Sequence, residues 1–349
     1  MPKALGQSVY LSTFAAQCPA LCGMVASGDM VFLSLHMGEE FGPDYQDQAR
    51  KVCWYLAEQG CRIVADVSVK TMEQFSCRDL AALARELKIW ALRVDYGLDK
   101  EQILVLARKM PVVVNASTIS WEDTREIGSQ GRQVYAMHNF YPRPETGLDE
   151  EYLLETTRAL HQAGLGVMAF IPGDTLLRGP VYEGLPTLEA HRRAAPSAAF
   201  VDLAMGYGID QIFLGDPGIS QGEWQRIQRF CRQQVISVPA VLEAPYRHLY
   251  DRVFTCRVDS PKALVRFQES REYASRGREV APENCLPRPR GTITLDNRNY
   301  GRYTGEIQLI RRDLSQDPRV NVIGQVPPAY FPLLEHIGGG SRFVLVEPE

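Results

Sequence analysis

Short apolar segments rich in β-branched residues recur along the first two thirds of the chain, and most of them end at a carboxylate, amide or imidazole. Eight such segments occur, at residues 5–11, 30–36, 62–66, 89–95, 111–115, 134–138, 166–171 and 209–216. A closed (β/α)8 barrel requires eight strands that are each followed by a helix, and it usually takes roughly 200 to 250 residues. The pattern therefore predicts an α/β fold with a TIM barrel from Leu5 to about Cys231, whose ligand site lies at the carboxyl ends of the strands.

Between the predicted strands, apolar residues recur at three- and four-residue spacing, which is typical of amphipathic helices. The predicted helices are residues 45–59, 77–87, 100–109, 150–163 and 192–207. Gly60, Gly164 and Gly208 follow three of them, at the position where many helices end in a left-handed residue. The agreement of these independent signals supports the barrel.

The composition indicates which partners to expect. The chain has 349 residues, of which 45% are hydrophobic and 23% charged, with a formal net charge of −4. A chain of this length buries a large core and is expected to form two domains. Because there is no basic excess and no Lys/Arg stripe interleaved with aromatic residues, we expect a small-molecule ligand and no nucleic-acid partner.

The cysteines and the N-terminus both indicate a cytoplasmic location. The eight cysteines lie mostly in apolar segments without CxxC spacing, which is typical of reduced, buried thiols. Residues 8–28, after Lys3, have the composition of a signal peptide, but cleavage there would remove the first strand and leave the barrel with an open edge. We therefore interpret this segment as the first strand and helix, and we find no segment suited to spanning a bilayer.

After about Pro239 the sequence changes character. Residues 258–290 are rich in charge and proline, and residues 291–310 alternate β-branched residues around a Gly- and Asn-rich turn. This pattern predicts a β-hairpin, and residues 320–326 and 342–346 supply further strands. We therefore predict a barrel domain at residues 1–238 and a small β-rich domain, with its connecting segment, at residues 239–349.

Several motifs, spread over nearly the whole chain, resemble the landmarks of one protein family. They are residues 6–10 (GQSVY), 92–97 (LRVDYG), 114–117 (VNAS), 138–142 (HNFYP), 146–148 (TGL), 178–180 (RGP), 184–189 (GLPTLE), 296–297 (DN) and 300–303 (YGRY). The family is that of the bacterial 6-phospho-N-acetylmuramidases, long catalogued as a domain of unknown function and sometimes as "outer surface protein". The resemblance implies a TIM barrel joined to a cyclophilin-like β domain. It also implies cytoplasmic hydrolysis of a 6-phosphorylated MurNAc-GlcNAc disaccharide, delivered by a sugar phosphotransferase system, in peptidoglycan recycling of the cell wall.

This implied activity calls for catalytic carboxyl groups. Glycoside hydrolysis normally needs one protonated carboxyl to assist the leaving oxygen and one ionised carboxyl to activate water or attack carbon. Asp66 and Asp95 end consecutive predicted strands, which lie about 4.8 Å apart, so two inward-facing carboxylates there are expected to approach closely and to ionise unequally. Glu40, on the loop after the second strand, is the third candidate. The structural alternative is that one aspartate pairs with Arg93 or with a neighbouring loop.

Sugar recognition calls for hydrogen-bonding groups on rigid strand ends, because hydroxyl and N-acetyl groups need both donors and acceptors. Asn115, His138, Asn139 and Tyr141 are the predicted sugar-binding residues. Asp216 is predicted either to bind sugar or to cap the following helix.

Phosphate recognition calls for guanidinium groups or a helix N-terminus. Arg178 lies after the seventh predicted strand in a loop with Gly and Pro, and the loops after strands seven and eight form the usual phosphate site of this fold. Arg302, from the second domain, is the other predicted phosphate ligand.

The chain departs from the family in one place. Members often carry a carboxylate just beyond the first strand, where Ser12 and Thr13 offer only hydroxyls here. If that acid is required, the protein has altered activity or none, so a phosphosugar-binding sensor is the first alternative. A phosphosugar aldolase or epimerase is the second, with Lys70 as the Schiff-base candidate, although its position beyond the strand predicts a solvent-facing side chain.

No cofactor is predicted. The sequence shows no cluster of metal ligands, and Gly338-Gly339-Gly340 lacks the Lys-Ser/Thr of a nucleotide-binding loop. The expected partner is a phosphorylated sugar, and the second domain is a candidate contact for a homodimer.

Overall fold

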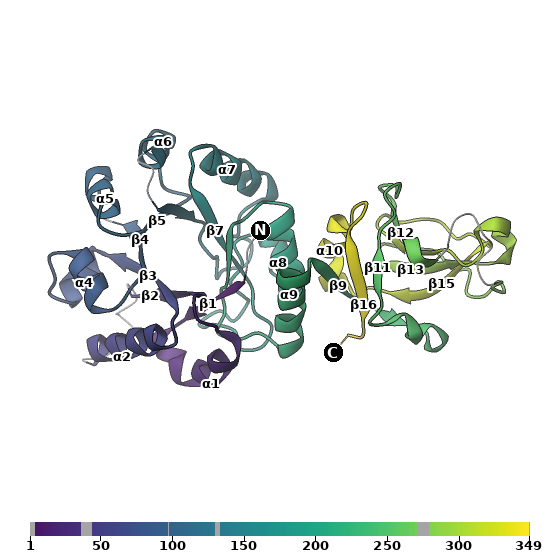
Figure 1. Cartoon of the computed structure of the whole chain (residues 1–349), viewed down its shortest axis with the longest axis horizontal. Helices are drawn as coiled ribbons and strands as arrows, with labels where there is room; N and C mark the ends of the chain where they lie inside the picture. The colour runs from purple at the N-terminus through teal and green to yellow at the C-terminus, as the bar shows by residue number, and fades with distance from the viewer. Residues whose placement is uncertain (1–3, 36–43, 97, 130–132, 271–278, 349) are drawn as a thin grey trace. The chain divides into compact units, whose positions relative to one another are not determined.

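The computed structural model describes residues 4–35, 44–96, 98–129, 133–270 and 279–348. The chain divides into two compact units, one formed by Met1–Arg192 with Leu203–Trp224 and the other by Arg193–Asp202 with Gln225–Glu349 (Figure 1). Each unit is described by itself.

The first unit contains a closed barrel of eight parallel strands, β1 to β8, paired in chain order and closed by β1 against β8. The strands are β1 Leu5–Val9, β2 Met30–Ser34, β3 Arg62–Ser68, β4 Ala91–Tyr96, β5 Val112–Asn115, β6 Val134–Met137, β7 Gly166–Ile171 and β8 Gln211–Leu214. Each of the eight predicted strands overlaps one of these, so the TIM-barrel prediction is confirmed.

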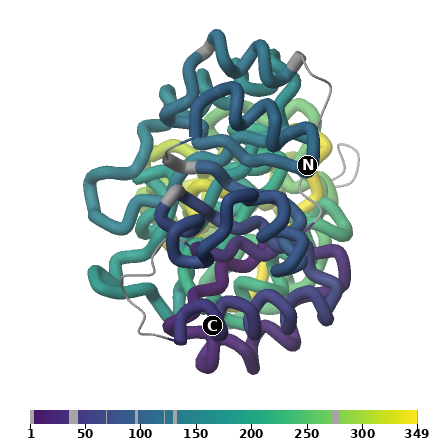
Figure 2. Tube along the Cα trace, turned by 90° about the vertical axis from the view of Figure 1, so that its left-hand side faces the viewer, coloured from purple at the N-terminus to yellow at the C-terminus, as the bar shows by residue number. Residues whose placement is uncertain are grey.

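Helices follow the strands in chain order. Figure 2 shows the path of the chain as a tube coloured from the N-terminus to the C-terminus. The bounds of the helices are α1 Phe14–Met24, α2 Tyr45–Glu58, α3 Val69–Gln74, α4 Leu80–Glu86, α5 Lys100–Ala107, α6 Trp121–Ser129, α7 Glu150–Gln162, α8 Pro196–Met205 and α9 Gln221–Gln233. The predicted left-handed glycines are confirmed, since φ is 77° at Gly60, 84° at Gly164 and 70° at Gly208. A capping box between Asp99 and Gln102 starts α5.

Aromatic side chains fill the barrel interior. The rings of Phe32 and Phe170 meet edge to face, with centroids 5.2 Å apart, and the centroid of Phe213 lies 5.7 Å from that of Phe170. Gly6 completes this layer, because a Cβ added there would lie 2.5 Å from the Phe213 ring. The barrel is therefore a packed core with room for a ligand only beyond this layer.

The second unit is rich in sheet, with a five-stranded sheet in the order β10-β15-β13-β14-β12 and a three-stranded sheet in the order β11-β16-β9. The strands are β9 Val235–Pro239, β10 Val241–Leu242, β11 Val253–Thr255, β12 Leu264–Arg266, β13 Thr292–Asp296, β14 Ile307–Ile310, β15 Val320–Gln325 and β16 Arg342–Val346, with a short helix α10 Phe331–His336. The predicted hairpin is confirmed as the antiparallel pair of β13 and β14, joined by a loop that contains the 3-10 helix η6 Arg298–Tyr303. The cyclophilin-like character of the second unit stays a prediction.

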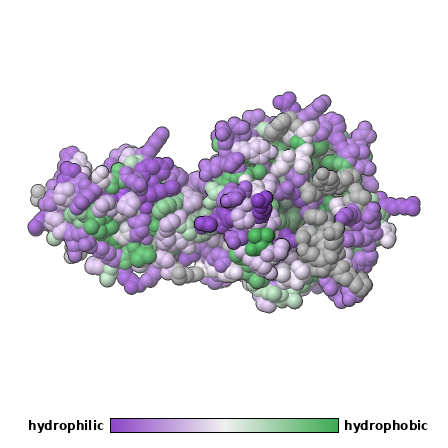
Figure 3. Space-filling model, turned by 180° about the vertical axis from the view of Figure 1, so that it is seen from behind, coloured by the Kyte–Doolittle hydropathy of each residue, from purple (hydrophilic) through white to green (hydrophobic). Residues whose placement is uncertain are grey.

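Polar side chains dominate the face of the molecule in Figure 3, with smaller apolar patches between them. The large apolar side chains are mostly buried in the described residues. None of the described helices combines the length and the apolarity that crossing a membrane takes.

Replacing Phe170 by Ala is predicted to lower the free energy of unfolding by about 3 to 5 kcal/mol, because the change opens a cavity among three aromatic rings. Urea unfolding followed by circular dichroism measures the loss. Leu176→Ala is the control, since Leu176 is 43% exposed and its truncation should change stability by less than about 0.5 kcal/mol. Equal effects of the two changes would contradict this account of the core.

Candidate active site

The register of the strands decides which side chains face the barrel interior. Phe32, Val64 and Ala91 are register partners on β2, β3 and β4, and all three belong to the apolar core of the barrel. Side chains alternate between the two faces of a strand, so residues two positions further on also face inward. These are Ser34, Asp66 and Arg93, again in register. A polar layer therefore follows the apolar layer toward the carboxyl ends of the strands.

Arg93 joins two of the predicted site residues. Its Nη1 donates a hydrogen bond to Oδ1 of Asp66 at 2.8 Å, and both side chains are only 4% exposed. Its Nη2 donates to Oδ1 of Asn139, which follows β6. The structural alternative for Asp66, an ion pair with Arg93, is thus observed, and this pair brings Asp66 and Asn139 together.

Asp95 occupies an irregularity of the barrel. Val67 of β3 pairs with Val94 of β4, whereas the next residue, Ser68, pairs with Tyr96, so Asp95 is an extra residue on β4. Such bulges are frequent beside active sites, where they re-aim a side chain. The side chain of Asp95 lies outside the described part of the structure, as does Glu40, so the catalytic role of either residue stays a prediction.

Tyr141 and Asn115 both lie near Ser117. The backbone N–H of Ser117 donates to Oδ1 of Asn115 at 2.9 Å. Burial raises the pKa of the Tyr141 phenol, while the neighbouring Ser117 side chain and the charge of Arg93 oppose the rise. Tyr141 and Asn115 therefore lie close to each other. The charge of Arg93 also acts on the Tyr141 phenol. Asn115 also lines a cavity of about 220 Å³ between β4, β5, α5 and α6.

Arg178 rests on two aromatic rings at the ends of β1 and β6. Its guanidinium carbon lies 4.2 Å from the ring centroid of Tyr10 and 5.8 Å from that of Phe140. Tyr10 is buried, and its phenol donates to the backbone oxygen of Gly215 at 2.5 Å. Burial raises the pKa of this phenol, so it stays protonated as a donor. The stack presents a cation on a rigid support.

Asp216 supports the segment that carries Arg178. Its two carboxylate oxygens accept backbone N–H groups from Gly173 at 2.8 Å, Arg178 at 3.0 Å and Leu185 at 2.9 Å. The side chain is fully buried, and burial raises its pKa although these hydrogen bonds and the Arg178 charge oppose the rise. The observed role is to anchor the loop after β7, and sugar binding by Asp216 stays a prediction.

Arg192 and Glu189 fix the segment that carries Tyr141. Glu189 accepts the N–H groups of Glu145 and Gly147, and it forms an ion pair with Arg192 that lowers its pKa to about 2. Arg192 also donates to the backbone oxygen of Tyr141 at 3.0 Å. The prediction that a helix starts at Arg192 is wrong, because this side chain is committed to the loop and α8 starts four residues later.

His138 faces the outside of the barrel. It follows Met137, which belongs to the inward-facing core, and its Nε2 lies 3.4 Å from Oγ1 of Thr157 on α7. The ring is fully buried, which lowers its pKa to about 4, and in the described part of the chain its Nδ1 has no hydrogen-bond partner. The expectation that His138 shares the mouth with Asn115 is therefore not supported, and the geometry gives this neutral imidazole a packing role.

Two further predicted residues belong to other elements of the chain, Arg302 to the second unit and Lys70 to α3. Arg302 belongs to the second unit, where it stacks on Tyr303 at 4.9 Å and donates to the phenol oxygen of the same residue at 2.8 Å. Lys70, the Schiff-base candidate, is exposed on α3, as expected. Sequence reasoning missed the supporting roles of Arg93, Tyr10 and Phe140, although Arg93 was named as a counterion.

Comparison of the sequence with known protein families identifies the family to which this chain belongs. Residues 5–229 match the family described as "6-phospho-N-acetylmuramidase, N-terminal", and residues 236–346 match "6-phospho-N-acetylmuramidase, C-terminal". The chain belongs to the 6-phospho-N-acetylmuramidase family. The predicted resemblance is thus confirmed over both halves of the chain.

Two solved structures are similar to this chain over nearly its whole length. A conserved Enterococcus faecalis protein of unknown function is 32% identical, with a TM-score of 0.85 over 99% of this chain and 96% of its own. An uncharacterised Bacillus cereus protein shares the fold at 21% identity, with a TM-score of 0.77 over 99% of this chain and 100% of its own. No curated protein matches the chain.

The structure describes Ser12, the position just beyond the first strand where the resemblance led us to expect a carboxylate. Ser12 is exposed in a 3-10 turn, Leu11–Thr13, directly after β1 and Tyr10. Across the described ranges, no three His, Cys, Asp or Glu side chains gather in a way that suits a metal ion. The side chains that this part of the structure brings to the rim are therefore carboxylates, amides, phenols and guanidinium groups.

Asp216→Asn is predicted to loosen the loop after β7, because an amide NH2 group in place of one oxygen would face backbone donors. Each buried N–H left without an acceptor costs about 1 to 3 kcal/mol. Hydrogen exchange at Arg178 and Leu185 should accelerate accordingly. Asp174→Asn, in the same loop but exposed, is the control and should leave both amides protected. Unchanged protection in the Asp216 variant would remove its anchoring role.

Proposed function

We propose that this protein is a cytoplasmic glycosidase that hydrolyses MurNAc-6-phosphate-GlcNAc in peptidoglycan recycling. The observation that carries the proposal is the family membership, which spans both units of the chain. The barrel rim supports it, because Asp66, Asn115, Asn139 and Tyr141 gather at the strand ends where barrel enzymes hold their substrates.

The ion pair with Arg93 suggests how the carboxyl groups divide the work. Arg93 donates to the buried carboxyl of Asp66 at 2.8 Å, so this carboxyl is already paired with a cation, and we assign it the role of base or nucleophile and not that of the acid. The proton for the leaving oxygen then has to come from a second carboxyl. We propose Asp95 for this role, on the bulge of the neighbouring strand, with Glu40 as the other candidate.

Sugar and phosphate recognition follow from the surrounding groups. Asn115, Asn139 and Tyr141 offer amide and phenol groups for the hydroxyl and N-acetyl groups of the substrate. Arg178 is proposed as the phosphate ligand, because stacking on Tyr10 holds a guanidinium fork in place before the ligand arrives. Arg302 of the second unit is the further candidate.

A phosphosugar sensor is the second candidate function, and the hydroxyl of Ser12 at a position where relatives often carry an acid favours it. Incubating the purified full chain with MurNAc-6-phosphate-GlcNAc and looking for free GlcNAc by mass spectrometry separates the two. Release of GlcNAc supports the glycosidase, whereas saturable binding without product supports the sensor.

Asp66→Asn and Asp95→Asn are each predicted to reduce kcat by about 10²- to 10⁴-fold, the usual contribution of a positioned acid or base. Asp66→Asn also weakens a buried ion pair, so turnover must be referred to the folded fraction measured by circular dichroism. Asp47→Asn, on the exposed face of α2, should leave turnover unchanged. Wild-type turnover in either site variant would exclude that residue from the chemistry.

Arg178→Ala is predicted to lower the preference for the phosphorylated disaccharide over the plain one by about 10- to 100-fold. This range corresponds to hydrogen bonds to a charged group worth about 1.5 to 3 kcal/mol. The ratio of the two kcat/KM values measures it, and Arg158→Ala on the exposed side of α7 is the matched control. An unchanged ratio would move the anion site elsewhere, with Arg302 as the next residue to replace.

A further inference from the structure

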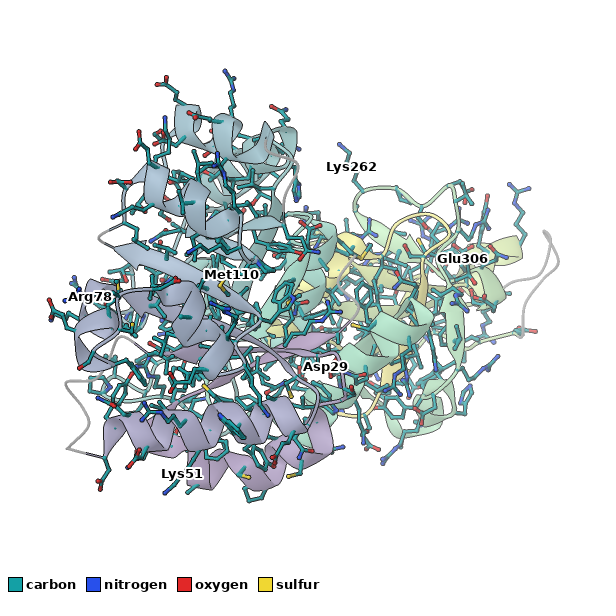
Figure 4. The ribbon with its side chains drawn as sticks, turned by 60° about the vertical axis from the view of Figure 1, so that its left-hand side comes forward. Asp29, Lys51, Arg78, Met110, Lys262 and Glu306 are labelled. Carbon is teal, nitrogen blue, oxygen red and sulfur yellow. The ribbon has the colours of Figure 1, made fainter. Side chains whose placement is uncertain are left out.

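One face of the five-stranded sheet in the second unit carries buried polar side chains. Thr294 of β13 pairs in register with Gln308 of β14, and Asp296 lies two residues further along β13 on the same face. Asp296 is only 3% exposed, and Thr294 and Glu306 are also buried. Figure 4 labels Glu306 among the side chains of this unit. Burying so many polar groups together is costly unless they satisfy one another.

The two carboxyl groups of this face have unequal partners. Glu306 forms a two-point ion pair with Arg266, with N–O distances of 2.5 and 2.9 Å. Among the described residues, the carboxyl of Asp296 accepts one hydrogen bond, from Nε2 of Gln308 to its Oδ2 at 3.3 Å, and the same nitrogen lies 3.4 Å from Oε1 of Glu306. Within the described residues, the buried Oδ1 of Asp296 has no partner. One shared amide is too little to hold a buried negative charge beside a second one.

The charges of Glu306 and Asp317 raise the pKa of Asp296, and those of Arg288 and Arg266 oppose the rise. The charged groups that act on Asp296 are Glu306 of β14, Arg266 of β12, Arg288 before β13, and Asp317 and Arg319 before β15. Arg266 is paired with Glu306, and Arg319 is paired with Asp317. Burial, followed by the charge of Glu306, raises the pKa of Asp296 to about 7.

Asp296 and Glu306 also close the base of a loop. The N–H of Asp296 donates to the backbone oxygen of Glu306 at 2.9 Å, and the N–H of Gly305 donates to the backbone oxygen of Asp296 at 2.8 Å. Between them lie residues 297–305, which include η6 and the stacked side chains of Tyr303 and Arg302. A repulsion between the two carboxylates would therefore act at the point where this loop is held.

We propose that Asp296 and Glu306 form a proton-dependent latch: the loop of residues 297–305 is held closed while Asp296 carries a proton and loosens when Asp296 ionises beside Glu306. A carboxyl that binds its proton more tightly in the closed state stabilises that state fully below its ordinary pKa, near 4. That stabilisation is lost as the pH rises through about 7. The latch does not rest on the activity proposed for the barrel, although the loop carries Arg302, the further candidate for phosphate binding.

A carboxyl titration tests the protonation. In the full chain labelled with ¹³C at the aspartate carboxyl carbons, the signal that disappears in Asp296→Asn identifies Asp296. We expect it to titrate near pH 7, about three pH units above an ordinary aspartate. A midpoint near pH 4 would overturn the proposal.

Hydrogen exchange tests the latch. After correction for intrinsic rates, amides of residues 297–305 in the wild type should exchange about tenfold faster at pH 8 than at pH 6, the change that one proton with a pKa near 7 produces. Asp296→Asn mimics the protonated form and should show equal protection at both values, whereas exposed Asp251→Asn should behave as the wild type. Equal protection in the wild type, or the same acceleration in Asp296→Asn, would overturn the latch.

Discussion

The site in the barrel depends on one buried cation. Arg93 lies between the carboxylate of Asp66 and the amide of Asn139, directly beyond an apolar layer of the interior. A buried guanidinium is stable only while its partners remain, because a charge left alone in such surroundings costs several kcal/mol. The ion pair therefore ties β3, β4 and the segment after β6 into one arrangement. A substitution at any of these three residues is therefore expected to change stability as well as the polar layer at the rim.

The fold was largely predictable because its signals are local. Parallel strands buried on both faces form continuous apolar runs, and left-handed glycines mark where helices end. The start of α8 was misplaced, because periodicity does not reveal that Arg192 binds a loop. The parallel pairing of β9 with β16 was not predicted at all. It joins Val235–Pro239 to Arg342–Val346, and the sequence of neither segment indicates which other strand it pairs with.

The sequence could place a side chain at the site only where its position along a strand was sufficient to show which end of the barrel it occupies. Asn115 and Asn139 could be placed near the rim of the barrel because they stand at or just beyond strand ends, and their role in sugar binding stays a prediction. His138 was misjudged because adjacent side chains face opposite sides, and one residue separates it from the inward-facing Met137. The bulge at Asp95 and the stack of Arg178 on Tyr10 depend on pairing between distant segments, which a single sequence does not display.

Three buried aspartates show how surroundings assign roles to one residue type. Asp66 has the guanidinium of Arg93 at hydrogen-bonding distance, so its carboxyl is held in a buried ion pair. Asp216 accepts hydrogen bonds from three backbone N–H groups, so its carboxylate holds the loop after β7 in place. The carboxyl of Asp296 accepts one hydrogen bond, from the Gln308 side-chain amide, which also lies beside the carboxyl of Glu306. Asp296 therefore favours its protonated form. The number and charge of the donors around a carboxyl, rather than its burial alone, therefore distinguish an ion-paired carboxyl from a loop anchor and from a proton-binding group.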